Sequence, residues 1–249
     1  MSQDDILNEA DRILEAAKKT NIILRLLGGV AIATKCPSAK HSAIARTYPD
    51  IDLIGPKKQS KQIRELFLTL GYESNQMFNA LRGATRLMYV DMPRKRKIDI
   101  FLDYFEMCHK LDLRQRLTID PKTIPVSDLL ATKLQIVKTT EKDFKDIAAI
   151  LLDYEVGTTD NAETLNGKRL AELCASDWGT YKTFTIVLDK TVTMTDSFNL
   201  TSSEKETIRT RIGEISKRIE SEPKSSRWKW RARVGEKAVW YKLPDDMAE

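Results

Sequence analysis

The apolar residues of this 249-residue chain change their spacing once, close to Pro125. Before that position they come in short runs, some rich in β-branched side chains and some alternating with polar residues, which is typical of strands. After it they recur every three or four residues over long stretches, which is typical of helices. Strands in the first half and helices in the second predict an α+β fold with a helical C-terminal half.

The first half predicts a small sheet with helices between its strands. In order along the chain we expect a buried strand over residues 22–27, a helix starting at residue 30, a strand over 50–54, a helix over 63–70, and an antiparallel hairpin of strands 85–90 and 98–102. Two glycines, Gly28-Gly29, separate the first strand from its helix. The basic turn of the hairpin, residues 93–97, is interpreted as a solvated loop.

The second half predicts helices over residues 127–139, 143–154, 167–175, part of 182–192, and 201–221. In the last of these an apolar stripe of four isoleucines must be covered by at least one other helix. We therefore predict three segments: an α/β domain over residues 1–124, a helical domain over 125–222, and a basic segment with tryptophans over 223–249.

Composition argues for a globular protein without a membrane span. Charged residues make up 31% and hydrophobic residues 41% of the chain, and no apolar run approaches the roughly 20 residues that a span needs. The first residues, Met-Ser-Gln-Asp-Asp, lack the basic segment followed by an apolar segment that is typical of a signal peptide. Three scattered cysteines indicate a reducing compartment and buried thiols rather than disulfides. We expect a cytoplasmic protein with no membrane partner.

Three aspartates in predicted strands are the candidate catalytic residues of the first half. Asp50 and Asp52 share one face of a predicted strand, and Asp99 lies between Ile98 and Ile100. Like charges this close repel unless a cation holds them, so the acids predict a site for divalent metal. Asp99 also fits an edge-strand surface carboxylate, and Asp103 is a reserve candidate.

The glycines could complete such a site. A strand that ends in Gly28-Gly29 before a helix leaves backbone N–H groups open to a phosphate. Many strand-to-helix junctions use two glycines only to turn the chain, so this feature is weak evidence by itself.

Together these motifs resemble those of the nucleotidyltransferase superfamily related to DNA polymerase beta. The matching segments are Leu-Gly-Gly-Val-Ala at residues 27–31, Arg-Thr-Tyr-Pro-Asp-Ile-Asp-Leu-Ile at 46–54, and Lys-Ile-Asp-Ile-Phe at 97–101. The branch that this chain resembles most is that of the abortive-infection-type nucleotidyltransferase toxins. The resemblance implies a nucleotidyltransferase-like mixed β-sheet with flanking helices.

The resemblance extends into the helical half, to about Tyr154. Lys133, in Leu-Ala-Thr-Lys-Leu, and the segment Asp-Phe-Lys-Asp-Ile at residues 143–147 are similar to a lysine motif and an acidic motif of that branch. Lys133 lies on an apolar helical stripe, where it could meet an anion or extend to the solvent. Asp143 has a structural alternative, a capping box with Thr140, so its role and that of Asp146 stay open.

The resemblance implies a reaction and a role for each residue. Asp50, Asp52 and Asp99 would bind two Mg²⁺ ions, with Mn²⁺ as an alternative, and Asp99 would help to deprotonate the acceptor hydroxyl. Gly28 and Gly29 would admit the phosphates of a nucleoside triphosphate (NTP). Lys133 would neutralise the triphosphate, and Arg46 and Asp143 would belong to the nucleotide site. Val30 departs from the family, where a serine is common.

The acceptor is suggested only by the C-terminal segment. Between Lys224 and Lys242 seven basic residues stand against the single acid Glu236, and three tryptophans are interspersed. This favours RNA, for example tRNA, as a partner, whereas the alternation over residues 227–234 fits an ordinary β-strand equally well. A protein acceptor, a toxin role and an antitoxin partner are further hypotheses. The alternatives are a small-molecule, antibiotic-type nucleotidyltransferase and a non-catalytic nucleotide-binding relative.

Overall fold

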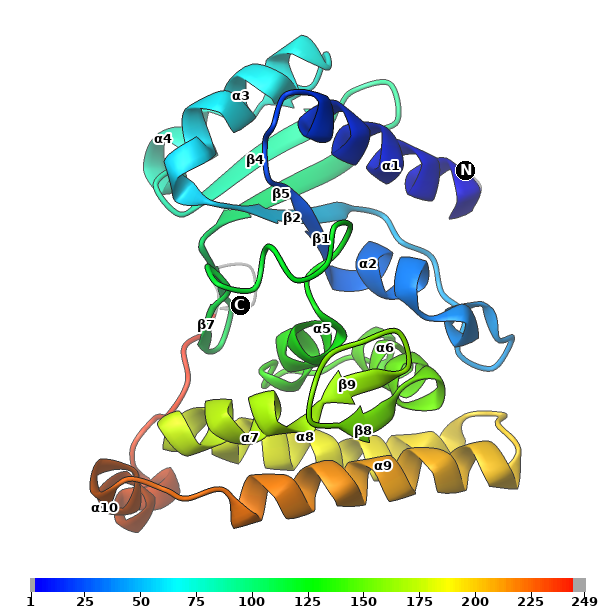
Figure 1. Ribbon diagram of the computed structural model, residues 1–249, viewed down its shortest axis with the longest axis vertical. Helices are drawn as coiled ribbons and strands as arrows, with labels where there is room; N and C mark the ends of the chain where they lie inside the picture. Colours follow the sequence, from blue (N-terminus) through cyan, green and yellow to red (C-terminus); the bar gives the residue numbers. More distant parts are fainter. Residues whose placement is uncertain (1–2, 244–249) are drawn as a thin grey trace. The chain divides into compact units, whose positions relative to one another are not determined.

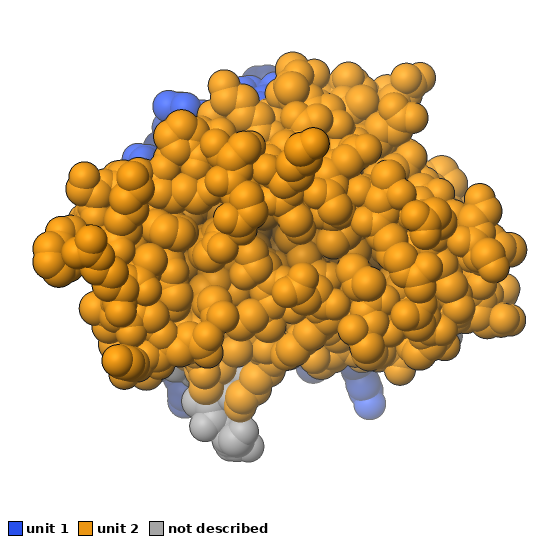
Figure 2. All heavy atoms as spheres, turned by 90° about the horizontal axis from the view of Figure 1, so that it is seen from below, with its two compact units in different colours: residues 1–35, 47–105, 110–125 blue, residues 36–46, 106–109, 126–249 orange. Residues whose placement is uncertain are grey.

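The computed structural model describes residues 3–243, and these form two compact units (Figures 1 and 2). The first unit consists of the described residues up to Lys35 together with residues 47–105 and 110–125. The second consists of residues 36–46, 106–109 and the described residues from Val126 onward. The boundaries at residues 124 and 223 stay predictions, and residues 244–249 of the basic segment lie outside the described residues.

A five-stranded mixed sheet is the framework of the first unit, with the strand order β1-β2-β5-β4-β3. Its strands are β1 (Arg25–Leu27), β2 (Ile51–Gly55), β3 (Glu73–Ser74), β4 (Arg86–Asp91) and β5 (Arg96–Leu102). β2 and β5 run parallel, and the other neighbours are antiparallel. The α+β fold class with a mixed sheet is therefore confirmed, and so is the β4–β5 hairpin.

Helices accompany the strands of this unit: α1 (Gln3–Lys19), α2 (Gly28–Lys35), α3 (Ser60–Thr69) and α4 (Gln76–Arg82). A short additional pair is formed by β6 (Tyr104–Glu106) and β7 (Lys110–Asp112). One face of the sheet packs into the core, where Tyr89 of β4 lies 4.9 Å, centroid to centroid, from the ring of Phe67 on α3. Because strand side chains alternate, Arg86, Lys97, Asp99 and Asp52 belong to the opposite face.

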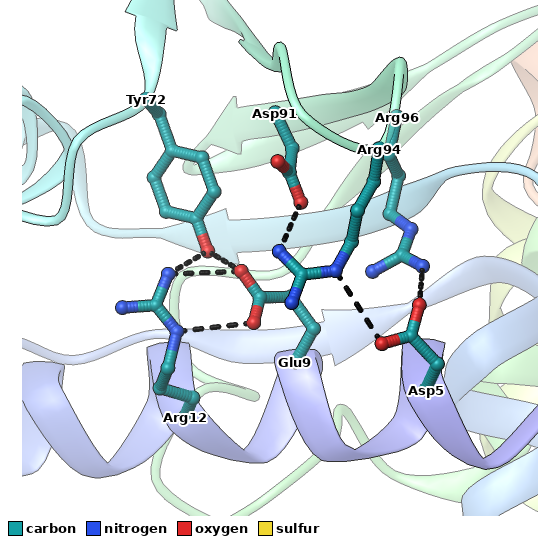
Figure 3. Close-up of polar contacts among 7 residues, drawn as sticks. All are labelled: Asp5, Glu9, Arg12, Tyr72, Asp91, Arg94 and Arg96. Atoms are coloured by element: carbon teal, nitrogen blue, oxygen red, sulfur yellow. Dashed lines mark hydrogen bonds and ion pairs between the residues drawn. The ribbon is translucent and has the colours of Figure 1, made fainter.

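A polar network links α1 to the rest of this unit (Figure 3). Glu9 accepts hydrogen bonds from Arg12 at 2.8 and 3.0 Å and from the hydroxyl of Tyr72. The hydrogen bond from Arg12 lowers the pKa of Glu9 to about 2, against the opposing effect of burial and with help from Tyr72. One turn earlier, Asp5 accepts from Arg96 of β5 at 2.7 Å.

The depressed pKa of Glu9 predicts an acid-sensitive contribution to stability. A carboxylate whose pKa is lower in the folded than in the unfolded chain stabilises the fold above its unfolded pKa. The stabilisation from Glu9 should thus be complete above about pH 4.5 and disappear as the pH falls towards 2. We expect thermal melting of Glu9→Gln to depend less steeply on pH in this window than melting of the parent. Glu15→Gln, at an exposed position of the same helix, serves as control, and an unchanged slope for Glu9→Gln would contradict the prediction.

The second unit is mostly helical, as expected. Its elements are α5 (Val126–Leu134), α6 (Glu141–Asp153), the parallel pair β8 (Glu155–Gly157) and β9 (Thr164–Asn166), α7 (Gly167–Ser176), α8 (Trp178–Ser197), α9 (Ser202–Ser221) and α10 (Ser226–Val234). Helices α7, α8 and α9 lie side by side (Figure 1). The predicted stripe of α9 is confirmed, since Ile208, Ile212, Ile215 and Ile219 are buried. Among the described residues, no helix combines the length and the apolar character that a bilayer crossing requires.

Local capping explains where the helix predictions differ from the structure. Helix α8 starts four residues earlier than expected because Asp177 accepts a hydrogen bond from the backbone N–H of Thr180. Helix α5 ends at Leu134, five residues before the predicted end, and the extended Thr140 then serves as the N-cap of α6. Helix α4 was not predicted from the sequence; Asn75 caps it by accepting a hydrogen bond from the backbone N–H of Phe78.

The alternative β-strand over residues 227–234 is wrong, because these residues form α10. Two of the tryptophans nevertheless pack within this unit. Trp228 donates from its indole to the carbonyl of Cys174 at 2.9 Å, and Trp240 donates to the hydroxyl of Thr183 at 3.2 Å. The side chain of Trp230 is exposed, beneath the guanidinium of Arg233 at 4.9 Å.

Candidate functional site

The sharp corner at Gly28 lies directly against one of the predicted acids. Strand β1 ends at Leu27 and α2 begins at once with Gly28, whose φ of +68° lies in the region that favours glycine. A Cβ at this position would lie only 2.2 Å from Oδ2 of Asp52. The glycine is therefore required both by its backbone conformation and by the carboxylate beside it, while Gly29 lies half-buried in the first turn of α2.

Asp52 and Asp99 come together through the pairing of β2 with β5. The two strands run parallel, and Asp52 is the register partner of Asp99. Register partners on neighbouring strands project from the same face, with backbones about 5 Å apart. Asp50, the third predicted acid, precedes the first residue of β2 and is half-buried. The structure thus brings two of the three acids together by strand register.

Asp99 is buried, with 2% of its side chain exposed, and two cations neutralise it. Arg86 of β4 donates from Nε to Oδ1 at 3.1 Å and approaches Oδ2 with Nη2 at 3.0 Å. The ammonium of Lys97 lies 2.9 Å from Oδ2. Neither cation was predicted from the sequence, although the spacing of Lys97 and Asp99 on one strand indicates a shared face.

The carboxylates of Asp52 and Asp99 fit a divalent cation by their donor chemistry, since hard cations such as Mg²⁺ take oxygen ligands. The carboxylate of Asp52 itself occupies the space that a Cβ at position 28 would take. Within residues 3–243, however, no three side chains of His, Cys, Asp or Glu gather into a ready metal-binding group. A metal at this pair would have to share Asp99 with its two cations.

Because Gly28 lies against Asp52, we expect a methyl group added at position 28 to lower the stability of the fold. Gly28→Ala should displace the carboxylate of Asp52 and strain a backbone with positive φ, at a cost of about 1–3 kcal/mol. Thermal melting measures this loss. The control is Gly213→Ala in α9, where a Cβ would meet nothing within 4 Å and alanine favours the helix, so stability should be kept or raised. Equal melting temperatures for Gly28→Ala and the parent would contradict this account of the corner.

The other three predicted site residues, Arg46, Lys133 and Asp143, belong to the second unit. Together with Asp146 they form a buried ionic cluster. Lys133 lies 3.0 Å from Asp143 and 2.8 Å from Asp146, and Arg46 forms two hydrogen bonds of 2.8 and 2.7 Å with Asp146. Burial opposes the charge of Lys133, but the two carboxylates raise its pKa overall. The pKa of Asp143 is lowered, because Lys133 and Thr140 outweigh the effect of burial.

This cluster answers one question that the sequence left open. The capping box between Thr140 and Asp143 is present, so Asp143 helps to cap the N-terminus of α6 and also pairs with Lys133. The ammonium of Lys133 therefore has anions within its own unit, and the role of Lys133, Asp143 and Arg46 towards a nucleotide stays a prediction.

The reserve candidate Asp103 lies outside β5, which ends at Leu102. Its φ is +65°, and its carboxylate accepts a hydrogen bond from the backbone N–H of Lys57 at 2.9 Å. This contact gives the carboxylate of Asp103 a structural partner in the backbone.

No protein-family model matches the chain, and no curated protein matches it in sequence. Among solved structures, the chain is similar to the antibiotic-resistance factor ANT(2'')-Ia, at 12% identity and a TM-score of 0.36, over 88% of this chain and 97% of that one. It is also similar to the STING-associated c-di-GMP synthase CdnE from Capnocytophaga granulosa, at 12% identity and a TM-score of 0.27, over 88% of this chain and 80% of that one.

Proposed function

We propose that this chain is a metal-dependent nucleotidyltransferase, which transfers a nucleoside monophosphate from an NTP to an acceptor hydroxyl and releases pyrophosphate. The main support for the proposal is that Asp52 and Asp99 are register partners on β2 and β5, and that Asp52 lies beside Gly28. Nucleotidyl transfer uses carboxylates that hold divalent cations, beside a helix start whose backbone N–H groups bind a phosphate. The sequence motifs around these residues support the same activity.

Each candidate site residue of the first unit has a role in the proposed reaction. Asp52 and Asp99, with Asp50 just before β2, would hold two Mg²⁺ or Mn²⁺ ions, which when bound supply charge neutralisation at the reacting phosphorus. Gly28 and Gly29 admit the β- and γ-phosphates to the backbone N–H groups at the start of α2. Asp99 accepts the proton of the acceptor hydroxyl or orients that hydroxyl. Catalysis of this kind rests on positioning and charge.

RNA is the acceptor that the C-terminal segment favours. The exposed ring of Trp230 with Arg233 above it offers a surface on which a base can stack, and the surrounding arginines and lysines suit phosphates. Trp228 and Trp240 are engaged within the protein, so this part of the proposal depends on α10 alone. The toxin role and the antitoxin partner stay predictions from the sequence resemblance.

The experiment that tests the activity is incubation of the protein with each labelled NTP, Mg²⁺ and total RNA. We expect label to enter RNA with at least one NTP and pyrophosphate to appear in equal amount. Omission of Mg²⁺ should abolish both signals. If no NTP yields pyrophosphate with RNA, protein or small-molecule acceptors, the proposed activity is wrong.

A further inference from the structure

The first unit has a cavity whose lining residues take no part in the proposed reaction. It lies between α1, residues 21–25 at the start of β1, and residues 121–122, and its volume is about 650 Å³. All of these residues belong to the first unit. Cavities of this size hold small organic molecules, so the chemistry of the wall indicates which class of molecule fits.

The cavity lies at the outer edge of the five-stranded sheet. β1 is the first strand of that sheet, and on its free side residues 122–124 form two backbone hydrogen bonds of 3.0 Å with Leu26. Two residues earlier, the carbonyl of Leu24 accepts a hydrogen bond of 2.7 Å from Nη1 of Arg25 instead. The guanidinium of Arg25 thus takes the place of a neighbouring strand at this edge.

This guanidinium is half-buried and has no carboxylate in direct contact. Its Nε is buried without a hydrogen-bond partner, and within residues 3–243 no acid forms an ion pair with it. Burial lowers the pKa of Arg25, and the attraction of Asp120 offsets this effect only in part. The carboxylate of Asp120 is already bound by Lys35 and by the backbone N–H groups of residues 122 and 123. A cation withdrawn from water without a partner costs free energy, which a bound anion offsets.

The rest of the wall combines positive charge with apolar surface. Lys18 of α1 also lines the cavity, and no described residue forms an ion pair with it. Lys122 pairs with Asp11 at 2.7 Å, which leaves Glu15 as the acid of the described lining without an ion pair. Two cations without partners therefore stand against one such acid. The apolar side chains of the wall are Leu14, Ile22, Ile23, Leu24 and Pro121.

We propose that this cavity binds a small organic anion, in which a carboxylate or phosphate group pairs with Arg25 and an apolar body packs against the aliphatic wall. Because Nη1 is held by Leu24, the edge formed by Nε and Nη2 receives the two oxygens of the anion. Lys18 adds positive charge from the side of α1. The inference goes beyond the proposed function and does not depend on it, since Gly28, Asp52 and Asp99 are not part of this wall.

The first test measures binding of three molecules that share one apolar chain. Octanoate, octyl phosphate and the neutral octanol are titrated into the full chain by calorimetry, below the concentrations at which they form micelles. Both anions should bind at least about tenfold more tightly than octanol, because charge-assisted hydrogen bonds to Arg25 are available to them alone. The tighter of the two anions identifies which oxyanion the site prefers. Equal binding of octanol, or no binding of either anion at millimolar concentration, overturns the inference.

The second test removes the cations one at a time. Arg25→Met should weaken the binding of the preferred anion about tenfold or more and leave octanol within about twofold. Lys18→Met should weaken the anion about two- to threefold. The matched control is Lys19→Met, because Lys19 is the next residue of α1, is exposed and does not line the cavity. Parental affinity in Arg25→Met, or an equal loss in Lys19→Met, contradicts the proposed site.

Thermal melting separates loss of the site from loss of the fold. Without ligand, Arg25→Met should melt at or above the temperature of the parent, since it removes a half-buried cation that lacks an anion. Arg25→Gln, which keeps an amide donor for the carbonyl of Leu24, is the second variant. The preferred anion should raise the melting temperature of the parent and of neither variant. If both variants melt far below the parent, Arg25 is already satisfied within the fold, and the inference is wrong.

Discussion

Asp52→Asn should leave a folded protein whose nucleotidyl transfer is reduced by about a thousandfold or more. Asparagine keeps the shape of the side chain beside Gly28 but removes the negative charge that Asp52 contributes at the level of Asp99. Losing several kcal/mol of charge stabilisation at the reacting phosphorus corresponds to a loss of this size. Release of labelled pyrophosphate measures the rate, and circular dichroism with thermal melting verifies the fold.

Asp103→Asn is the matched control for this prediction. Asp103 follows directly after β5 and has a positive φ, a conformation that asparagine also tolerates. Its carboxylate serves a backbone N–H, so we expect transfer to continue near the parental rate. Full transfer by Asp52→Asn would refute the proposed active site, and loss of transfer in Asp103→Asn would move the site towards the end of β5.

Lys133→Met should destabilise the second unit by about 3–5 kcal/mol, the usual result of breaking a buried ion pair from one side. The ammonium is surrounded by Asp143 and Asp146, whose side chains are 12% and 2% exposed, so its removal leaves buried negative charge with Arg46 as the remaining cation of the cluster. For a chain of this size the melting temperature should fall by about 10 °C.

Lys145→Met is the control that shows whether loss of any lysine of the second unit lowers the melting temperature. Lys145 pairs with Glu141 one turn away on α6, and that partner is 64% exposed. Pairs of this kind contribute about 0.3–0.5 kcal/mol, so the melting temperature should change little. If Lys133→Met melts like the parent and instead loses affinity for NTP, Lys133 serves the nucleotide, as the sequence resemblance implies.

Some features of the candidate site follow from the local sequence pattern, and others do not. Alternation over residues 50–54 predicts that Asp50 and Asp52 share a face, and the two glycines predict a turn into a helix; the structure has that turn at Gly28. Such features depend on a few consecutive residues, because strand alternation and a positive φ are local properties of the backbone. The partners of Asp99 depend instead on which strands become neighbours.

The buried ionic cluster gives a second example. Lys133 on an apolar stripe allows two predictions, an anion nearby or extension to the solvent, and Thr140 with Asp143 allows a capping box, which is present. The sequence did not reveal that Asp146 would accept hydrogen bonds from Arg46, a residue 100 positions away. Contacts over such distances arise only when whole elements pack, so no local pattern contains them.

The sequence by itself determined the succession of short strands and long helices, the Gly28 turn, and the alternation that puts Asp52 and Asp99 opposite their apolar neighbours. Tertiary structure alone decided that β2 and β5 pair in parallel, that Asp52 stands level with Asp99, and that Arg86 and Lys97 neutralise Asp99. The physical reason is that side-chain periodicity follows from backbone geometry within a few residues, whereas strand order and register follow from the packing of the whole sheet.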